Sequence, residues 1–152
     1  MAEFTRQEIV KLVATGQSIS LRGVDLSGLD LSYLNLSGAD LSYANLEKAD
    51  LAHTWLHQAG LFSANLAEAN LTGATLRLAD LVGANLTNAN LGQVDMSQAT
   101  LCGVMLSGTN LAESVCEDAN FDGAQVDATT VWPENFDPGQ FDLFVEPAGD
   151  IP

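Results

Sequence analysis

The chain has 152 residues and a formal net charge of −15, which comes from 20 acidic and 5 basic side chains. This acidity argues against direct binding to nucleic acid or to anionic membranes, and it favours a basic partner. No apolar run approaches the length of about 18 residues that a membrane-spanning helix needs, and the length fits one domain.

The first predicted element is a short helix over residues 5–15. Thr5 and Glu8 have the spacing of a capping box, in which the N-cap Thr is followed three residues later by Glu. Gly16 is placed to end the helix. We interpret residues 1–17 as an N-terminal cap. The apolar residues that we expect to cover the end of the structure are Ile9, Leu12 and Val13.

A repeat of five residues follows, from Ile19 to Val131. Leucine recurs at every fifth position from 21 to 91, and other apolar residues continue the series to Val131. A period of five fits neither an α-helix nor a plain β-strand. In a quintet such as Ala-Asn-Leu, the Ala and Leu of an extended segment would point inward and the Asn outward. The next two residues turn the chain, and eight glycines occupy the second of these positions, where a type II turn needs positive φ.

A single turn of such a coil cannot bury its leucines alone, so coils must stack on one another. Stacking also gives each extended segment a hydrogen-bonding neighbour. The sequence therefore predicts an all-β solenoid with a dry interior. The central leucines expected in this core stack include Leu41, Leu46, Leu51, Leu56, Leu61, Leu66, Leu71, Leu76, Leu81 and Leu86.

The tandem pattern Ala-(Asp/Asn)-Leu-X-X closely resembles the pentapeptide-repeat family, over 23 consecutive quintets. The resemblance implies a right-handed quadrilateral β-helix with four quintets, or about twenty residues, per coil. Residues 18–131 would then form five to six coils, in which residues one coil apart stack in columns. Short members of this kind, without inserted loops, are typical of cyanobacteria.

The repeat breaks at Trp132 and Pro133, because proline cannot continue a hydrogen-bonded ladder. We interpret residues 132–152 as an irregular C-terminal cap and tail, in which Trp132 and Phe136 close the far end. The segment 141–145 is too apolar for a free tail. Two alternatives remain for it: it folds back on the rod, or it docks on a second copy to form a homodimer.

Nothing in the sequence indicates a catalytic, cofactor or metal site. Catalysis needs several groups that converge in a cleft, whereas a solenoid without insertions is convex. His53 and His57 would lie on the order of 10 Å apart on an extended face, too far to share a metal ion. We therefore expect a protein that is not an enzyme and binds no cofactor. The start of the chain does not resemble a secretory signal, so we expect a cytoplasmic protein, although a signal removed earlier would leave the same sequence.

The outward position before each central Leu is Asp or Asn fourteen times, but it is Trp at position 55. An exposed Trp with His and Arg nearby has the composition of an interaction hot spot. The candidate interaction patch consists of His53, Trp55, His57, Phe62 and Arg77. The alternative is that Trp55 lies flat and covers the edge of the coil, since scattered surface aromatics are ordinary.

The charge is concentrated in one half of the chain. Residues 1–77 hold eight acids and five bases, whereas residues 78–152 hold twelve acids and no base. One interpretation is that the acids provide solubility and that Asp is what the repeat requires at the outward position. The other follows from the resemblance, because some members mimic duplex DNA and protect type II topoisomerases such as gyrase.

The charge of the rod allows some mimicry of duplex DNA but does not favour it. Duplex DNA carries about 16 charges over about 27 Å, the expected length of the rod, and the repeat region here carries −10. The gyrase-directed relatives are typically longer and often carry a projecting loop, which this repeat lacks. We therefore predict a non-catalytic protein-interaction or structural module with an acidic surface and a protein partner, for which a basic partner fits best. A DNA-mimicking inhibitor or protector of gyrase is the alternative.

Overall fold

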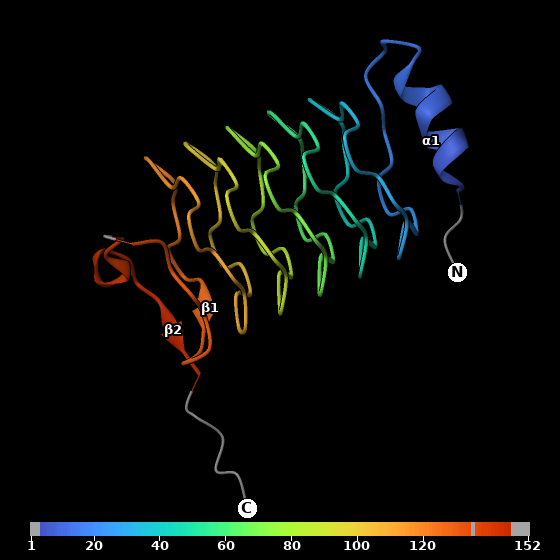
Figure 1. The fold of residues 1–152 in the computed structure, drawn as a ribbon. Coiled ribbons are helices and arrows are strands. Elements are labelled where there is room, and N and C mark those ends of the chain that lie inside the picture. The colour runs from blue at the N-terminus through green and yellow to red at the C-terminus, as the bar shows by residue number, and fades with distance from the viewer. Residues whose placement is uncertain (1–3, 135, 147–152) are drawn as a thin grey trace, which may run out of the picture.

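The computed structural model describes residues 4–134 and 136–146. The chain winds into a rod of stacked coils, with a helix at one end and the C-terminal segment at the other (Figure 1). The elements in chain order are α1 (Arg6–Val13), β1 (Gln125–Val126), the 3-10 helix η1 (Pro138–Gln140) and β2 (Phe144–Val145). Within these described residues, no helix is both long enough and apolar enough to cross a membrane.

Parallel bridges between coils define the register of the rod. Each outward position from Ser20 to Met105 pairs with the residue twenty positions later, so that one coil contains four quintets. Around Gly60, for example, the Leu41 amide donates to the Gly60 carbonyl at 2.7 Å, and the Gly60 amide donates to the Ala39 carbonyl at 2.9 Å. The ladder therefore satisfies the backbone of the extended segments that have a coil on both sides, although each segment is very short.

The interior of the rod is a continuous apolar column. The leucines from Leu41 to Leu86 at the central positions are 0% exposed, and the alanines two residues before them are at most 1% exposed. A threonine takes this small position at Thr54, where its hydroxyl donates to the Leu31 carbonyl at 3.1 Å. Each fully buried leucine contributes about 1.5–3 kcal/mol relative to exposure, so the column is the main source of stability.

The second turn residue has positive φ in every quintet between Leu21 and Ala124. Eight of these residues are glycines, as the sequence predicts, but thirteen are not, with φ between 51° and 61°. Tyr33 and Leu78 are two of them. The left-handed conformation costs such residues about 1–2 kcal/mol each. The ladder and the leucine column must offset this cost, because all of these corners adopt positive φ at the same position.

The outward Asp and Asn residues shape the corners that follow them. All fourteen accept a hydrogen bond from the backbone amide two residues later, as in the 3.0 Å bond from the Ser27 amide to Asp25 Oδ1. Such Asx turns mimic a backbone turn. Side chains also bond between coils: Asn45 Nδ2 donates to Asp25 at 3.2 Å, and Asn65 Nδ2 donates to Asn45 at 3.0 Å. The preference for Asp or Asn therefore has a structural cause.

Helix α1 lies against the first coil. Thr5 and Glu8 form the capping box, with both reciprocal hydrogen bonds present. Ile9 is 0% exposed, and Val13 packs against the core from a partly buried position. Leu12 is 37% exposed, so it covers the end less completely than Ile9 does. The helix turns Ile9 and Val13, which are one turn apart, toward the coil.

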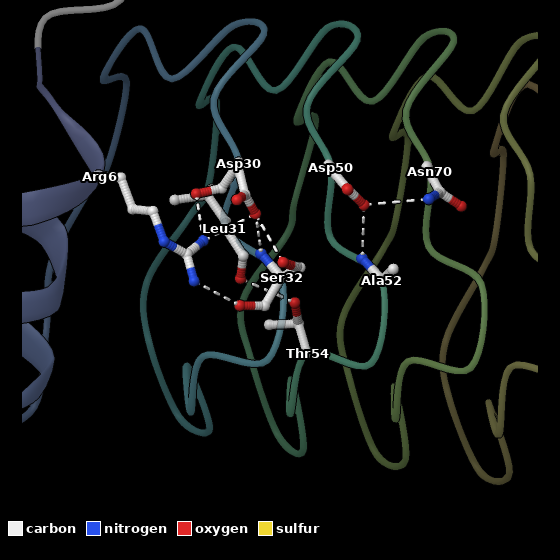
Figure 2. A network of polar contacts seen from close by, with 8 residues as sticks. All are labelled: Arg6, Asp30, Leu31, Ser32, Asp50, Ala52, Thr54 and Asn70. Atoms are coloured by element: carbon white, nitrogen blue, oxygen red, sulfur yellow. Dashed lines mark hydrogen bonds and ion pairs between the residues drawn. The ribbon is translucent and has the colours of Figure 1, made fainter.

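The Arg6 side chain completes the edge of the first coil (Figure 2). Its Nη1 donates to the Asp30 carbonyl at 2.6 Å and to Asp30 Oδ1 at 2.7 Å, and its Nη2 donates to the Ser32 carbonyl at 3.0 Å. In the next coil, the equivalent carbonyls of Asp50 and Ala52 accept backbone amides of the first coil. The guanidinium thus takes the place of the amides that a preceding coil would supply.

The register shifts by one residue in the last full coil. Asn110 pairs with Val131, twenty-one positions later, because the corner after Val126 holds an additional residue. Asp127 builds this longer corner by accepting the amides of Gly108 and Thr129. The prediction that Val131 continues the inward series is therefore wrong: Val131 takes an outward position and is 48% exposed.

Aromatic rings close this end of the column. Trp132, Phe136 and Phe141 each pack edge-on against the buried Phe121, with ring centroids 5.4 to 5.5 Å apart. The chain then folds back on the rod, where β2 pairs in parallel with β1. Segment 141–145 therefore folds back on the rod, which is the first of the two alternatives that the sequence leaves open. The side chains of β2 remain exposed.

Replacing Arg6 with Ala should lower the free energy of unfolding by about 1–2 kcal/mol, because two edge carbonyls lose a charged donor. Urea denaturation followed by circular dichroism measures the change. Lys48→Ala is the control, because the ion pairs of Lys48 with Glu47 and Glu68 are exposed on both sides. Their loss should lower the free energy of unfolding by about 0.5 kcal/mol or less. Equal losses in the two variants would contradict the capping role of Arg6.

The Asx turns should make stability fall in acid. The hydroxyl and amide of Ser27 lower the pKa of Asp25 to about 2, and the hydroxyl and amide of Ser42 lower the pKa of Asp40 below its usual range. An unfolded Asp has a pKa of about 3.9. These carboxylates therefore contribute fully to the free energy of unfolding above about pH 4, and their contribution is lost as the pH falls toward 2.

The double variant Asp25→Asn, Asp40→Asn keeps both turns but cannot titrate at these positions. Urea midpoints at several pH values between 7 and 2 should fall less for this variant than for the wild type. Identical acid profiles for the two proteins would show that the Asx turns do not carry the effect.

Candidate interaction surface

Trp55 lies on one side of the rod, in the second coil. The outward positions of this side, bridged in this order, are Asn35, Trp55, Thr75, Asp95 and Val115. The Trp55 side chain is 55% exposed. As an indole, it cannot accept the amide hydrogen bond that an Asp or Asn makes at this position. The side therefore presents a large aromatic ring to solvent at a place where the repeat normally caps a corner.

His53 stands at the corner before Trp55 and is stacked on Tyr33. The two rings are 5.0 Å apart with an interplanar angle of 25°. On the other side of His53, in the same column, lies Gly73. A Cβ at Gly73 would approach His53 Nδ1 to 2.6 Å, so the glycine leaves space for the ring in its present position. His53 is therefore held between two neighbouring coils.

Arg77 and His57 occupy the corner after Trp55. The Arg77 guanidinium forms an ion pair with Asp95, at 3.3 Å between Nη1 and Oδ2, on the side that carries Trp55. His57 and His53 thus lie at successive corners of one coil. Among the residues described, no group of three or more His, Cys, Asp or Glu side chains could hold a metal ion, and Cys102 and Cys116 are free cysteines.

Phe62 belongs to a separate aromatic cluster, beyond the side that carries Gly60. Its ring packs edge-on against Tyr43 at 5.4 Å. The Arg22 guanidinium lies over the Tyr43 ring, 4.6 Å from its centroid. The structure therefore divides the predicted patch in two. We call Tyr33, His53, Trp55, His57 and Arg77 the Trp55 surface, and Arg22, Tyr43 and Phe62 the Tyr43 cluster.

Tyr43 and Arg22 are not visible as neighbours of Phe62 when only residues twenty positions apart are compared. Phe62 is nineteen positions after Tyr43, and Arg22 is twenty-one positions before it. These contacts run diagonally between the two residues of one corner, and a search that allowed one position of offset would have found them.

Comparisons with known proteins agree with this geometry. The family model for pentapeptide repeats matches residues 19–58 and 64–103 in eight copies. The crystal structure of Rfr23, a pentapeptide repeat protein from the cyanobacterium Cyanothece 51142, is similar with a TM-score of 0.63 and 34% sequence identity. The alignment covers 75% of this chain and 88% of Rfr23.

Two further structures are more distantly similar. A pentapeptide repeat protein from Nostoc PCC 7120 has 26% identity and a TM-score of 0.45, over 93% of this chain and 96% of its own. Full-length QnrB1, a plasmid-mediated fluoroquinolone resistance protein, has 18% identity and a TM-score of 0.31, over 85% of this chain and 91% of its own. A search of curated proteins found no match. Since the family model matches more than half of the chain and Rfr23 is similar in both sequence and structure, the chain belongs to the pentapeptide-repeat family.

Proposed function

We propose that this protein is a non-catalytic interaction module: a right-handed quadrilateral β-helix of five to six coils, capped by α1, that binds a protein partner through the Trp55 surface. One observation carries the proposal. Fourteen outward residues cap a corner, whereas Trp55 gives up this hydrogen bond and exposes more than half of its side chain to water. The fold itself gives no reason for a tryptophan at this position.

The surroundings of Trp55 support the same proposal. The stack of Tyr33 on His53 and the ion pair between Arg77 and Asp95 hold the neighbouring side chains in place. The backbone beneath them is part of the inter-coil ladder. A partner would meet a surface that is already ordered and would lose little entropy in binding it. Trp, Tyr and Arg are also the residues that most often dominate binding energy.

An enzymatic role has less support. His53 and His57 flank Trp55 at successive corners of a convex coil, so they do not converge on one point. A general base and a nucleophile would need to lie within hydrogen-bond reach of one another and of a substrate. We therefore assign no reaction to the Trp55 surface.

The alternative of a DNA mimic that protects a type II topoisomerase is not favoured. QnrB1 is described as a fluoroquinolone resistance protein, but at 18% identity its likeness extends to the fold alone. Duplex DNA is uniformly charged, whereas this chain carries −3 in residues 1–77 and −12 in residues 78–152. The bridges also keep a constant spacing from Ser20 to Gln125, which leaves no place for an inserted loop in this part of the rod.

The variant Trp55→Asn separates binding from stability. Asn at this position should form the Asx turn and bond to Asn35 in the column, so the free energy of unfolding should stay constant or rise by about 0.5–1 kcal/mol. Partner capture from the lysate of the native host, quantified by mass spectrometry, should fall by about tenfold. Met105→Asn makes the same kind of change at an outward position on another side of the rod, so it is the matched control and should capture the partner as the wild type does.

Two results would refute the proposal. Equal recovery of every partner by wild type and Trp55→Asn would show that Trp55 binds nothing. A loss of more than about 1 kcal/mol in stability would show that Trp55 covers the edge of the coil instead.

A further inference from the structure

The two ends of the hydrogen-bonded ladder are finished differently. At the N-terminal end, Arg6 donates to the edge carbonyls of the first coil. At the other end, the amides of Asp118 and Phe121 and the carbonyl of Ala119 have no hydrogen-bond partner within residues 4–134 and 136–146. One coil earlier, the equivalent groups all pair with the last coil, at 2.7 to 3.0 Å. This stretch is therefore an open edge that could accept another strand.

The C-terminal cap does not close this edge. A groove of about 810 Å³ lies over it, between residues 114–120 of the last coil and the cap residues Pro133, Phe136 and Phe141. We call this space the terminal groove. β2 covers the neighbouring side of the coil by pairing with β1. The fold thus adds a strand over β1 but leaves space where the next strand over Asp118–Phe121 would lie.

The terminal groove is strongly acidic. Glu117, Asp118, Asp122 and Glu134 line it, and residues 78–152 contain no Lys or Arg that could neutralise them. None of these four acids occupies an outward position of the repeat, so corner capping does not account for them. Carboxylates gathered around an open strand edge attract cationic side chains.

We propose that the terminal groove binds an extended segment of a partner protein that carries Lys or Arg side chains, which adds a strand to the edge at residues 118–121. The free amides and carbonyl would bond to the main chain of the segment, and the acids would select its basic side chains. The inference rests on the proposed function as an interaction module, but it uses a different surface from Trp55. A second copy of the chain is a poor occupant, because each copy carries −15.

The probe is a fluorescein-labelled peptide of about eight residues in which valine and lysine alternate, a length that spans the edge. Titration of the full chain, followed by fluorescence anisotropy, should show saturable binding to one site. Glu117→Arg should weaken binding by about tenfold or more. Arginine is tolerated at this turn position, because Arg77 occupies the same position of the repeat.

Glu47→Arg is the matched control. It makes the same change of charge at the same turn position on another corner, and it should weaken binding by less than about twofold. Asp122→Arg is a second groove variant, in the column that carries Arg22, and it should behave like Glu117→Arg. Thermal melts of all three variants identify any that fail to fold.

Backbone pairing is tested separately from charge. The same peptide with N-methyl groups on alternate amides keeps its lysines but loses donors, and it should bind at least about tenfold more weakly. Hydrogen exchange at the amides of Asp118 and Phe121 should slow when the unmodified peptide is bound. Equal binding of both peptides, or no effect of the groove variants, would show diffuse attraction to an acidic rod and overturn the proposal.

Failure of this inference can be told apart from failure of the proposed function. Trp55→Asn should bind the peptide as the wild type does, because Trp55 lies two coils or more from the groove in the bridge series. Loss of peptide binding in Trp55→Asn would mean that the peptide uses the Trp55 surface, and the terminal groove would then be rejected.

Discussion

Hydrogen bonds between successive coils fix the register of the rod, and every other feature depends on this register. The spacing of twenty residues places each central leucine over another leucine and each outward side chain over another outward side chain. The ladder also holds thirteen residues other than glycine in a left-handed conformation that they would avoid elsewhere. Only a cooperative array, in which each coil supports its neighbours, can sustain this cost at so many corners.

The sequence predicts the repetitive part of this fold well and the exceptions poorly. A strict five-residue period indicates inward leucines such as Leu41 and turns such as the one at Gly23, because both follow from local geometry. The number of sides came from a family resemblance, since the period alone does not determine it. The period predicts an inward Val131, but one additional residue at the corner of Asp127 shifts the register, and a period cannot show where it ends.

The candidate sites also differ in how much of each the sequence predicts. Trp55 was identifiable because it departs from a pattern, and the structure leaves its ring exposed. The sequence pattern does not reveal that Phe62 packs against Tyr43, because this contact is diagonal. The open edge at Asp118 could not be predicted at all, since it depends on how the cap is placed over the last coil. In a solenoid, the residues that follow the repeat stabilise the fold. Residues that differ from the repeat are therefore the first candidates for a functional role.

The central claim is the register itself, and scalar couplings across hydrogen bonds test it most directly. In an isotopically labelled sample, NMR should detect coupling from the Leu41 amide to the Gly60 carbonyl and from the Gly60 amide to the Ala39 carbonyl. The same two spacings should recur along the rod as far as Gln125. Couplings at any other constant spacing would mean a coil with a different number of sides, and the columns that define both candidate surfaces would be wrong.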